Sequence, residues 1–309
     1  MSQPNIFIMT PFINSKTTNL IYNAFKNRNV EVYKICLSNT NLFISNKSIY
    51  YDKQKCQNDK LYSKYLAKNI INFKPDAIIS RGIGIRETKK IFFRVDIYRA
   101  LEILDIPVIN SSLCLELATN KMLTSLLLKQ NNIPTPDTYI CEKYKDAISA
   151  YELLGGDIIF KPMFGSKGVG ITRINDKNFA EYFFYNVSKL GEPFYLQKFM
   201  EHGNKDIRAF VINDEVIASM ERIGTNWKTN IFQGAIGKPI NLSDDLKEIC
   251  IKSANIVKAK ISGIDIIQTN EGYYVIEVNA VPGFNELQNV TKINIADKIA
   301  QYILEYVKK

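Results

Sequence analysis

The sequence predicts an α/β unit followed by an α+β region, and three observations support this fold class. Residues 1–110 alternate short apolar strands with amphipathic helices, the pattern of a parallel sheet covered by helices. From residue 157 onwards short strands follow one another closely, which favours an antiparallel sheet with helices packed on it. The chain also has 309 residues, more than one hydrophobic core normally organises, so we expect two or three packed units.

The N-terminal unit, assigned to residues 1–110, is expected to form one parallel sheet. Its strands are apolar or alternating segments, and its helices carry apolar residues at helical spacing. The predicted strands are 5–9, 30–35 and 76–80, the predicted helices are 18–25, a stretch that ends at 68–73, and 87–104, and a last apolar segment is 107–109.

The remainder of the chain is divided into a central part, residues 111–190, and a C-terminal part, residues 191–309. The central part begins with a helix from about 113 to 130, because Asn131, Asn132, Pro134 and Pro136 are stop signals. The strands predicted after it are 158–163, 170–174, 193–200, 206–212, 215–221, 263–269 and 273–280, and the helices are 177–189, 244–259 and 292–306.

The charge distribution limits the classes of partner. Lys and Arg number 40 against 31 Asp and Glu, which gives a formal net charge of +9. Basic residues are scattered among acidic ones and form no block longer than a pair. This diffuse excess argues against nucleic acid and membrane surfaces as partners and favours nucleotides and acidic small molecules.

The cysteine and histidine content limits compartment and chemistry. The cysteines are far apart and form no CxxC pair, so we expect reduced, buried thiols in a cytoplasmic protein. They are Cys36, Cys56, Cys114, Cys141 and Cys250. The N-terminus lacks the features of a signal peptide, and no apolar run approaches the ~18 residues that span a bilayer. A single histidine, His202, excludes zinc or iron sites built from several histidines. His202 lies beside Gly203 and Asn204 in a predicted turn and is therefore a poor candidate for a general base.

A lysine followed by a glycine-rich loop is the first candidate for ligand binding. Lys161 lies on a predicted strand, and Gly165, Gly168 and Gly170 follow in a loop. Glycines permit positive φ and a close backbone approach, so successive N–H groups can face phosphate oxygens beside a lysine charge. The segment matches neither the Walker loop nor GxGxxG, and an ordinary hairpin turn with a solvated lysine is the alternative.

Two C-terminal strands carry oxygen ligands. Asp265 lies on one strand, and Glu277 and Asn279 lie on the same face of the next. Carboxylate and amide oxygens between apolar strands are costly to bury unpaired, and they are the ligands that Mg²⁺ prefers. The alternative is a solvated polar sheet face. Arg208 and Arg222, on neighbouring strands, are predicted to clamp a phosphate or carboxylate, with a surface ion pair as the alternative.

As an ordered set, these residues resemble the ATP-grasp superfamily and, within it, the RimK-like carboxylate–amine ligases, over most of the chain. The matching segments are 120–121, 161–162 with the glycine loop, 197–199, 206–208, 228–230, 263–265 and 277–283. Segments 226–230 and 282–291 resemble the branch that adds glutamate to tetrahydromethanopterin, although Phe284 stands where Trp is expected, and lysine-biosynthesis ligases share a similar Trp-x-Thr-Asn stretch. The resemblance implies an ATP-grasp fold with an N-terminal Rossmann-like (pre-ATP-grasp) domain.

The resemblance also implies roles for individual residues. Lys121 and Lys161 would contact ATP phosphates, the backbone at Lys198 and Phe199 would hold adenine, and Asp206 would hold the ribose. Lys198 replaces the acidic residue common in relatives. The complete implied nucleotide set is Lys121, Lys161, Gly165, Ser166, Lys167, Gly168, Gln197, Lys198, Phe199, Asp206 and Lys228. Arg208, Arg222 and Asn230 would face the γ-phosphate and the acyl phosphate, and Asp265, Glu277 and Asn279 would hold one or two Mg²⁺ or Mn²⁺ ions.

The implied reaction is ATP-dependent amide-bond formation through an acyl phosphate, with L-glutamate added to a tetrahydromethanopterin-type pterin and ADP and phosphate released. One alternative is a RimK-like ligase for another acceptor, namely a deazaflavin coenzyme, an amino-group carrier protein or a protein C-terminus. Another is a non-catalytic nucleotide-binding protein. The expected partners are ATP, L-glutamate and an anionic carboxylate acceptor, and relatives commonly form homo-oligomers. Arg81 and Arg86 are candidates for the acceptor's anionic groups, or else part of a strand-to-helix turn.

Overall fold

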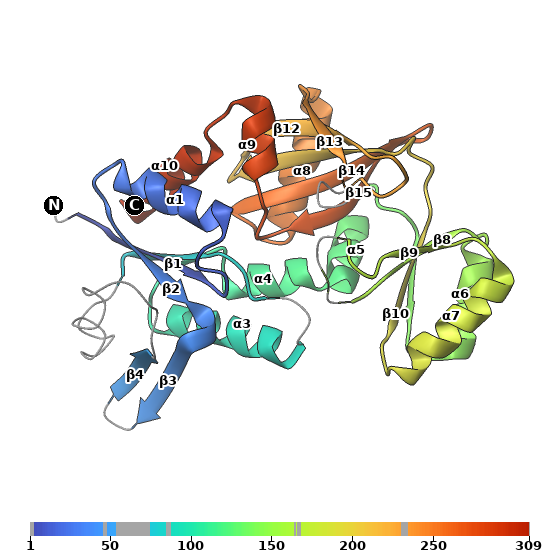
Figure 1. The fold of residues 1–309 in the computed structure, drawn as a ribbon, viewed down its shortest axis with the longest axis horizontal. Helices are drawn as coiled ribbons and strands as arrows, with labels where there is room; N and C mark the ends of the chain where they lie inside the picture. The colour runs from blue at the N-terminus through green and yellow to red at the C-terminus, as the bar shows by residue number, and fades with distance from the viewer. Residues whose placement is uncertain are drawn as a thin grey trace. The chain divides into compact units, whose positions relative to one another are not determined.

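The computed structural model describes residues 3–45, 48–53, 75–84, 88–163, 165, 168–229 and 234–308 (Figure 1). The chain forms two compact units, residues 1–115 with 294–309 and residues 116–293. The C-terminal helix therefore belongs to the same unit as the N-terminal strands. The boundaries predicted from the sequence, after residues 110 and 190, stay predictions.

The first unit contains a parallel sheet. Its strands lie in the order β2 (Glu31–Cys36), β1 (Asn5–Thr10), β5 (Ala77–Ser80) and β6 (Val108–Ile109). All three pairings are parallel, which confirms the α/β prediction for this part of the chain. The segment predicted to end a helix at 68–73 lies outside the described residues.

Helices and a hairpin complete the first unit. The helices are α1 (Lys16–Lys26), α3 (Thr88–Ile103) and α10 (Ile295–Val307), and a short 3-10 turn, η1, spans Leu37–Asn39. Helix α1 begins after Ser15, whose Oγ accepts a hydrogen bond from the N–H of Thr18. Helix α10 packs on α1, and an ion pair of 2.8 Å joins Arg28 to Asp297. The antiparallel hairpin of β3 (Thr40–Ser45) and β4 (Ser48–Lys53) was not predicted.

The helix predicted from about 113 to 130 is two helices, α4 (Ser112–Thr119) and α5 (Lys121–Gln130). The sequence prediction was wrong here because Asn120 has an extended backbone, and its side chain caps α5 by accepting a hydrogen bond from the N–H of Leu123 at 3.2 Å. Lys121 is therefore the first residue of α5.

The second unit begins with a four-stranded antiparallel sheet. The strands lie in the order β7 (Thr138–Cys141), β10 (Phe194–Lys198), β8 (Ile158–Lys161) and β9 (Thr172–Ile174). Helices α6 (Tyr144–Leu153) and α7 (Lys177–Lys189) lie side by side against it (Figure 1). Phe160 and Leu196 join the core that these helices cover. Because strand residues alternate, Lys161, Tyr195 and Gln197 point to the opposite face.

A second antiparallel sheet follows in the same unit. Its strands lie in the order β13 (Ile236–Pro239), β12 (Glu215–Ile223), β11 (Lys205–Ile212), β14 (Ile261–Thr269) and β15 (Gly272–Asn279). Helix α8 (Asp244–Ile256) contacts four of these strands, and α9 (Asn285–Thr291) contacts β12 and β13. The α+β prediction is confirmed, with two antiparallel sheets in place of one. Seven of the eight residues of β11 are buried, so Asp206 and Arg208 lie in the protein interior, whereas Lys205 is exposed.

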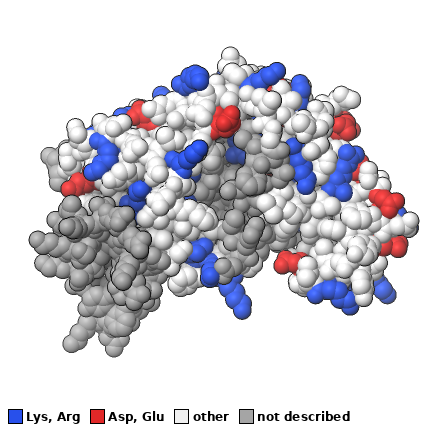
Figure 2. All heavy atoms as spheres, viewed as in Figure 1, with Lys and Arg blue, Asp and Glu red and all other residues white. Residues whose placement is uncertain are grey.

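The surface and the thiols follow the sequence expectations in part. On the face drawn in Figure 2, Lys and Arg are dispersed over the described surface with Asp and Glu among them. Of the four described cysteines, Cys114 and Cys250 are buried and Cys36 and Cys141 are half-buried, and Cys56 lies outside the described residues. Among the described helices, none combines the length and the apolar character needed to cross a membrane.

Candidate active site

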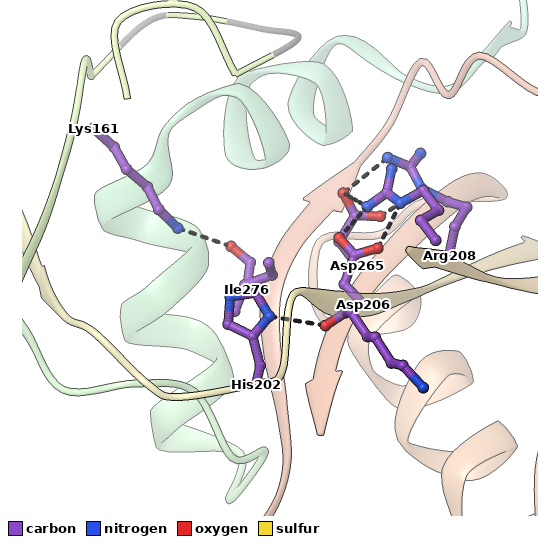
Figure 3. Close-up of polar contacts among 8 residues, drawn as sticks. Lys161, His202, Asp206, Arg208, Asp265 and Ile276 are labelled. Atoms are coloured by element: carbon purple, nitrogen blue, oxygen red, sulfur yellow. Dashed lines mark hydrogen bonds and ion pairs between the residues drawn. The ribbon is translucent and has the colours of Figure 1, made fainter. Parts of the chain in front are cut away.

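Lys161 is a buried cation whose hydrogen-bond partners are neutral. Its Nζ donates to Gln197 Oε1 at 2.7 Å. It also donates to the carbonyl oxygen of Ile276 at 3.5 Å (Figure 3). Burial lowers the pKa of Lys161 from 10.5 to about 8; nearby Glu277 raises it, Lys121 lowers it further and Asp265 raises it. Lys161 therefore has neutral hydrogen-bond acceptors, and the nearby Glu277 carboxylate offsets only part of the effect of burial.

Lys121 lies close to Lys161 and is half-buried. From the first turn of α5 its Nζ donates to the carbonyl oxygen of Met163 at 3.2 Å, again a neutral acceptor. Burial lowers the pKa of Lys121 below its ordinary value, and Glu277 opposes this shift. We call Lys121 and Lys161 the lysine cluster. Two neighbouring ammonium groups with neutral hydrogen-bond acceptors form a site that favours an anion such as phosphate.

The glycine loop that follows β8 has the backbone that its sequence predicts. Gly168 and Gly170 have φ of 71° and 79°, values that side chains disfavour. A Cβ at Gly170 would lie 2.7 Å from Cγ of Pro162, so the position also needs glycine for space. Gly165 is exposed, and Ser166 and Lys167 lie outside the described residues, so their contacts with phosphate stay predictions.

Four charged side chains on the five-stranded sheet contact one another in series, in the order Asp206, Arg222, Asp265 and Arg208. We call them the arginine–aspartate network. Arg222 binds Asp206 bidentately, from Nε and Nη2, with both distances 2.6 Å, and its Nη2 lies 3.1 Å from Asp265 Oδ2. Arg208 Nη2 donates to Asp265 Oδ2 at 2.8 Å, and its Nε lies 2.5 Å from Oδ1 without hydrogen-bond geometry (Figure 3). All four residues are at most 9% exposed, so these are buried ion pairs and not the surface pairs considered as the alternative.

Charge balance in this network is reflected in the pKa values. Burial raises the pKa of Asp265, but Arg208 and Arg222 outweigh it and hold the pKa below its ordinary value. Burial lowers the pKa of Arg222, but Asp265 and Asp206 outweigh it and hold the pKa above its ordinary value. At Asp206 burial outweighs the pairing with Arg222 and holds the pKa above its ordinary value. The network is therefore neutral as a unit where both aspartates are ionised.

The three predicted metal ligands lie on one face of β14 and β15. Asp265 pairs with Glu277 and Gly263 pairs with Asn279 across the strands, and paired residues share a face. A bulge leaves Ile276 without a partner in β14, and its carbonyl is the one that accepts from Lys161. A Cβ at Gly263 would lie 2.5 Å from Arg208 Nη1, so this glycine makes room for the guanidinium beside Asp265.

These residues fit Mg²⁺ by their chemistry. They provide two carboxylates and one amide oxygen. Asp265 Oδ1 accepts no hydrogen bond from the described residues but lies 2.5 Å from Arg208 Nε, so a metal at this oxygen would replace that ion pair. In the same part of the chain no group of three or more His, Cys, Asp or Glu side chains is arranged to hold a metal by itself. Substrate phosphates would therefore complete the coordination shell, as is usual for Mg²⁺.

The segment predicted to hold adenine is surrounded by aromatic side chains. The Arg173 guanidinium stacks 3.5 Å from the centroid of the Phe199 ring, and Trp227 meets that ring edge-on at 6.3 Å. The N–H groups of Lys198 and Phe199 donate to the carbonyls of residues 137 and 157, so an adenine contact from these two residues would use carbonyl oxygens.

Other residues predicted to belong to the site are members of neither the lysine cluster nor the arginine–aspartate network. Lys228 lies with Nζ 5.1 Å from the Trp227 ring, and Asn230 lies outside the described residues. His202 donates from Nδ1 to the carbonyl of Lys205 at 2.9 Å in a turn, in keeping with its weak candidacy as a base. Arg81 directly follows β5 in the first unit, and Arg86 is not among the described residues.

Sequence reasoning missed several polar side chains that support these clusters. Tyr195, Thr138 and Ser125 form hydrogen bonds around Gln197, and Thr229 hydrogen-bonds Asp206. Tyr195 had one available signal, because it lies two residues before Gln197 and therefore on the same face of its strand.

Comparisons with known proteins identify the family to which this chain is similar. The model of a RimK-like ATP-grasp domain matches residues 118–303. The tetrahydromethanopterin:alpha-L-glutamate ligase of Methanocaldococcus jannaschii is 36% identical over 224 residues, which cover 70% of this chain and 76% of that protein. The alpha-aminoadipate–LysW ligase LysX of Saccharolobus solfataricus is 34% identical over 209 residues, which cover 66% of this chain and 76% of that protein.

Solved structures show the same fold. The ATP-grasp ligase PsnB complexed with a minimal precursor superposes with a TM-score of 0.73 at 16% identity and covers 99% of both chains. The D-alanine–D-alanine ligase from Bacillus anthracis complexed with ATP superposes with a TM-score of 0.70 at 17% identity, covering 98% of this chain and 97% of that one. The predicted ATP-grasp fold is confirmed.

Proposed function

Because this chain belongs to the RimK-like ATP-grasp family and is an ATP-dependent carboxylate–amine ligase, we propose that it adds L-glutamate to a pterin cofactor of the tetrahydromethanopterin type. The similarity to two ligases of that name, at 36% and 33% identity, supports this substrate. The main structural support for a phosphate site is the lysine cluster. Its ammonium groups donate to neutral acceptors and lie beside the strand that contains Glu277 and Asn279. Phosphate oxygens and oxygen-bound Mg²⁺ fit that arrangement.

The reaction requires activation of a carboxylate. A carboxylate is a poor electrophile because its charge repels a nucleophile and oxide is not a leaving group. Transfer of the γ-phosphoryl group of ATP to a carboxylate oxygen of the acceptor releases ADP and forms an acyl phosphate. The neutral amine of glutamate then attacks the acyl carbon, phosphate leaves with the electrons of the broken C–O bond, and the amine loses a proton.

In this mechanism the protein positions groups and balances charge. Lys121 and Lys161 hold the phosphates, and the glycine loop covers them and excludes water from the acyl phosphate. Asp265, Glu277 and Asn279 would hold Mg²⁺, or Mn²⁺, which when bound neutralises phosphate charge. Arg208, Arg222 and Asn230 are assigned to the γ-phosphate and acyl phosphate, Asp206 to the ribose, and Gln197, Lys198, Phe199 and Lys228 to the rest of the nucleotide site.

A second acceptor class has its own support. The similarity to LysX, at 34% identity, is almost as high as that to the pterin ligases. An amino-group carrier protein is therefore the second candidate acceptor, and a deazaflavin coenzyme and a protein C-terminus follow it.

Mass spectrometry of products tests the proposal. The purified chain with ATP, Mg²⁺, L-glutamate and the pterin should yield a pterin heavier by one or more glutamate residues, together with ADP and phosphate. Formation of AMP and pyrophosphate would overturn the acyl-phosphate mechanism. Glutamate added only to a carrier protein, a deazaflavin or a peptide C-terminus would overturn the pterin assignment. Binding of ATP without any product across this panel would favour the non-catalytic alternative.

A further inference from the structure

Gln197 lies beside Lys161 on the face of the four-stranded sheet that α6 and α7 do not cover. Tyr195 pairs directly with Lys161 across β10 and β8, and Gln197 pairs with Thr138 across β10 and β7. Gln197 follows Tyr195 by two residues, so the four side chains share one face. Gln197 is only 3% exposed, and its amide must therefore find hydrogen-bond partners inside the protein.

The hydrogen bonds of Gln197 leave a single orientation for its amide. Nε2 donates to Thr138 Oγ1 at 3.1 Å and to the Tyr195 hydroxyl at 3.2 Å, which uses both of its hydrogens. The Tyr195 hydroxyl also shares a hydrogen bond with Ser125 Oγ, 2.6 Å away on α5, in which either oxygen can donate. A reversed amide would turn its NH₂ group towards the Lys161 ammonium, which has no acceptor to offer.

This orientation turns Oε1 towards Lys161. The 2.7 Å hydrogen bond to Oε1 and the longer contact to the Ile276 carbonyl account for two of the three ammonium hydrogens. Both acceptors are neutral, so they fix the direction of the ammonium without neutralising its charge. A carboxylate at position 197 would fill the same space but would form an ion pair with the lysine.

We propose that Gln197 is a positioning residue for phosphate binding, because its neutral amide, oriented by Thr138 and Tyr195, holds the Lys161 ammonium in place and leaves its charge available for an anion. This inference rests on the proposed ATP site. It moves the role of Gln197 from a contact with the nucleotide to an action through Lys161.

Calorimetric titration with ATP and Mg²⁺, without acceptor, tests this role. Gln197→Glu should weaken ATP binding by about 10-fold or more, since a charged hydrogen-bond partner competes with phosphate for the lysine. Gln268→Glu makes the same change of charge at an exposed position of β14 in the same unit and should leave ATP affinity unchanged. Thr138→Val removes one of the two acceptors that orient the amide and should weaken binding by a smaller factor.

A double-mutant cycle separates positioning from a general structural effect. Gln197→Met should weaken ATP binding in the wild-type background and have no further effect in a Lys161→Met background. Additive effects in the two backgrounds would overturn the inference, as would ATP affinities of Gln197→Glu and Thr138→Val equal to that of the wild type. If the wild-type chain itself binds no ATP, the proposed function fails at its nucleotide site, an outcome distinct from wild-type binding that the Gln197 variants retain.

Discussion

The lysine cluster and the arginine–aspartate network differ in the charge of the partners that their cationic side chains contact. In the network each guanidinium contacts a carboxylate, and the closest contacts of Arg222 with Asp206 are 2.6 Å. In the lysine cluster the hydrogen-bond acceptors are an amide oxygen and backbone carbonyls. Both lie in the same compact unit, so the difference reflects local pairing and not the overall fold.

The difference shows in what each cluster can do. Ion pairing keeps Asp265 and Arg222 charged over a wide pH range, whereas burial without a charged partner lowers the pKa of Lys161 to about 8. The charges of the network are thus paired with each other in the ligand-free protein, and Arg208, Arg222 and Asp206 would exchange part of this pairing for contacts with a bound nucleotide. The lysine cluster is unsatisfied, and an anionic ligand would supply the missing charge. The following substitutions and the pH dependence test whether each cluster mainly stabilises the fold or mainly binds a ligand.

The largest effect is expected from breaking the network with Asp265→Asn. This substitution removes the carboxylate that pairs with both Arg208 and Arg222, and loss of one partner from a buried ion pair costs about 3–5 kcal/mol. The free energy of unfolding, measured with urea, should fall by that amount, and ligase activity should be lost as well. Asp157→Asn is the matched control, because Asp157 also binds an arginine bidentately but in a pair whose side chains are 28% and 37% exposed.

The control should lose only about 0.2–1 kcal/mol, the range of exposed ion pairs. Equal losses of stability in the two variants would show that the network does not organise the sheet. A stable Asp265→Asn protein without activity would assign Asp265 to the metal alone.

An effect of opposite sign is expected from Lys161→Met. The ordinary pKa of 10.5 and the folded-state pKa of about 8 imply that keeping this lysine charged costs the fold up to about 3 kcal/mol at pH 7. The variant should therefore unfold at a higher urea concentration than the wild type while its ATP affinity falls. Lys238→Met, at an exposed position of β13, should change neither property. A Lys161→Met protein that is less stable than the wild type would show that the lysine supports the fold.

Local sequence patterns predicted the parts of this site that depend on a single strand. The alternation around residues 263–269 and 273–280 placed Glu277 and Asn279 on one face, and the register confirms it. The segment after Lys161 predicted the backbone of Gly168 and Gly170. These features depend on neighbours within a few residues, where propensity and period are informative.

The pairings themselves were not predictable because they join distant segments. Lys161 and Gln197 are 36 residues apart, and Arg208 and Asp265 are 57 residues apart. Their contact depends on which strands become neighbours and in which register, and one sequence does not determine that. The break at Asn120 was missed for a local reason, since the helical spacing of apolar residues continues across the cap.

The smallest effect is expected from a change of pH. It distinguishes the two clusters because the lysine cluster, unlike the arginine–aspartate network, should titrate near pH 8. Lys161 faces Glu277, Lys121 and Asp265, and in the free protein its pKa is about 8. A bound phosphate raises that pKa, so above pH 8 binding requires uptake of a proton, and ATP affinity should fall by up to about 10-fold per pH unit. Stability should change in the opposite sense, because the unfolded chain binds the proton up to about pH 10.5 and the free energy of unfolding therefore rises between these values. ATP affinity should be measured between pH 7 and 9.5 for the wild type and for Lys161→Arg, which stays charged. The difference between the two profiles gives the contribution of Lys161 protonation to ATP binding. A wild-type profile as flat as that of the arginine variant would show that Lys161 does not carry the charge that holds the phosphates.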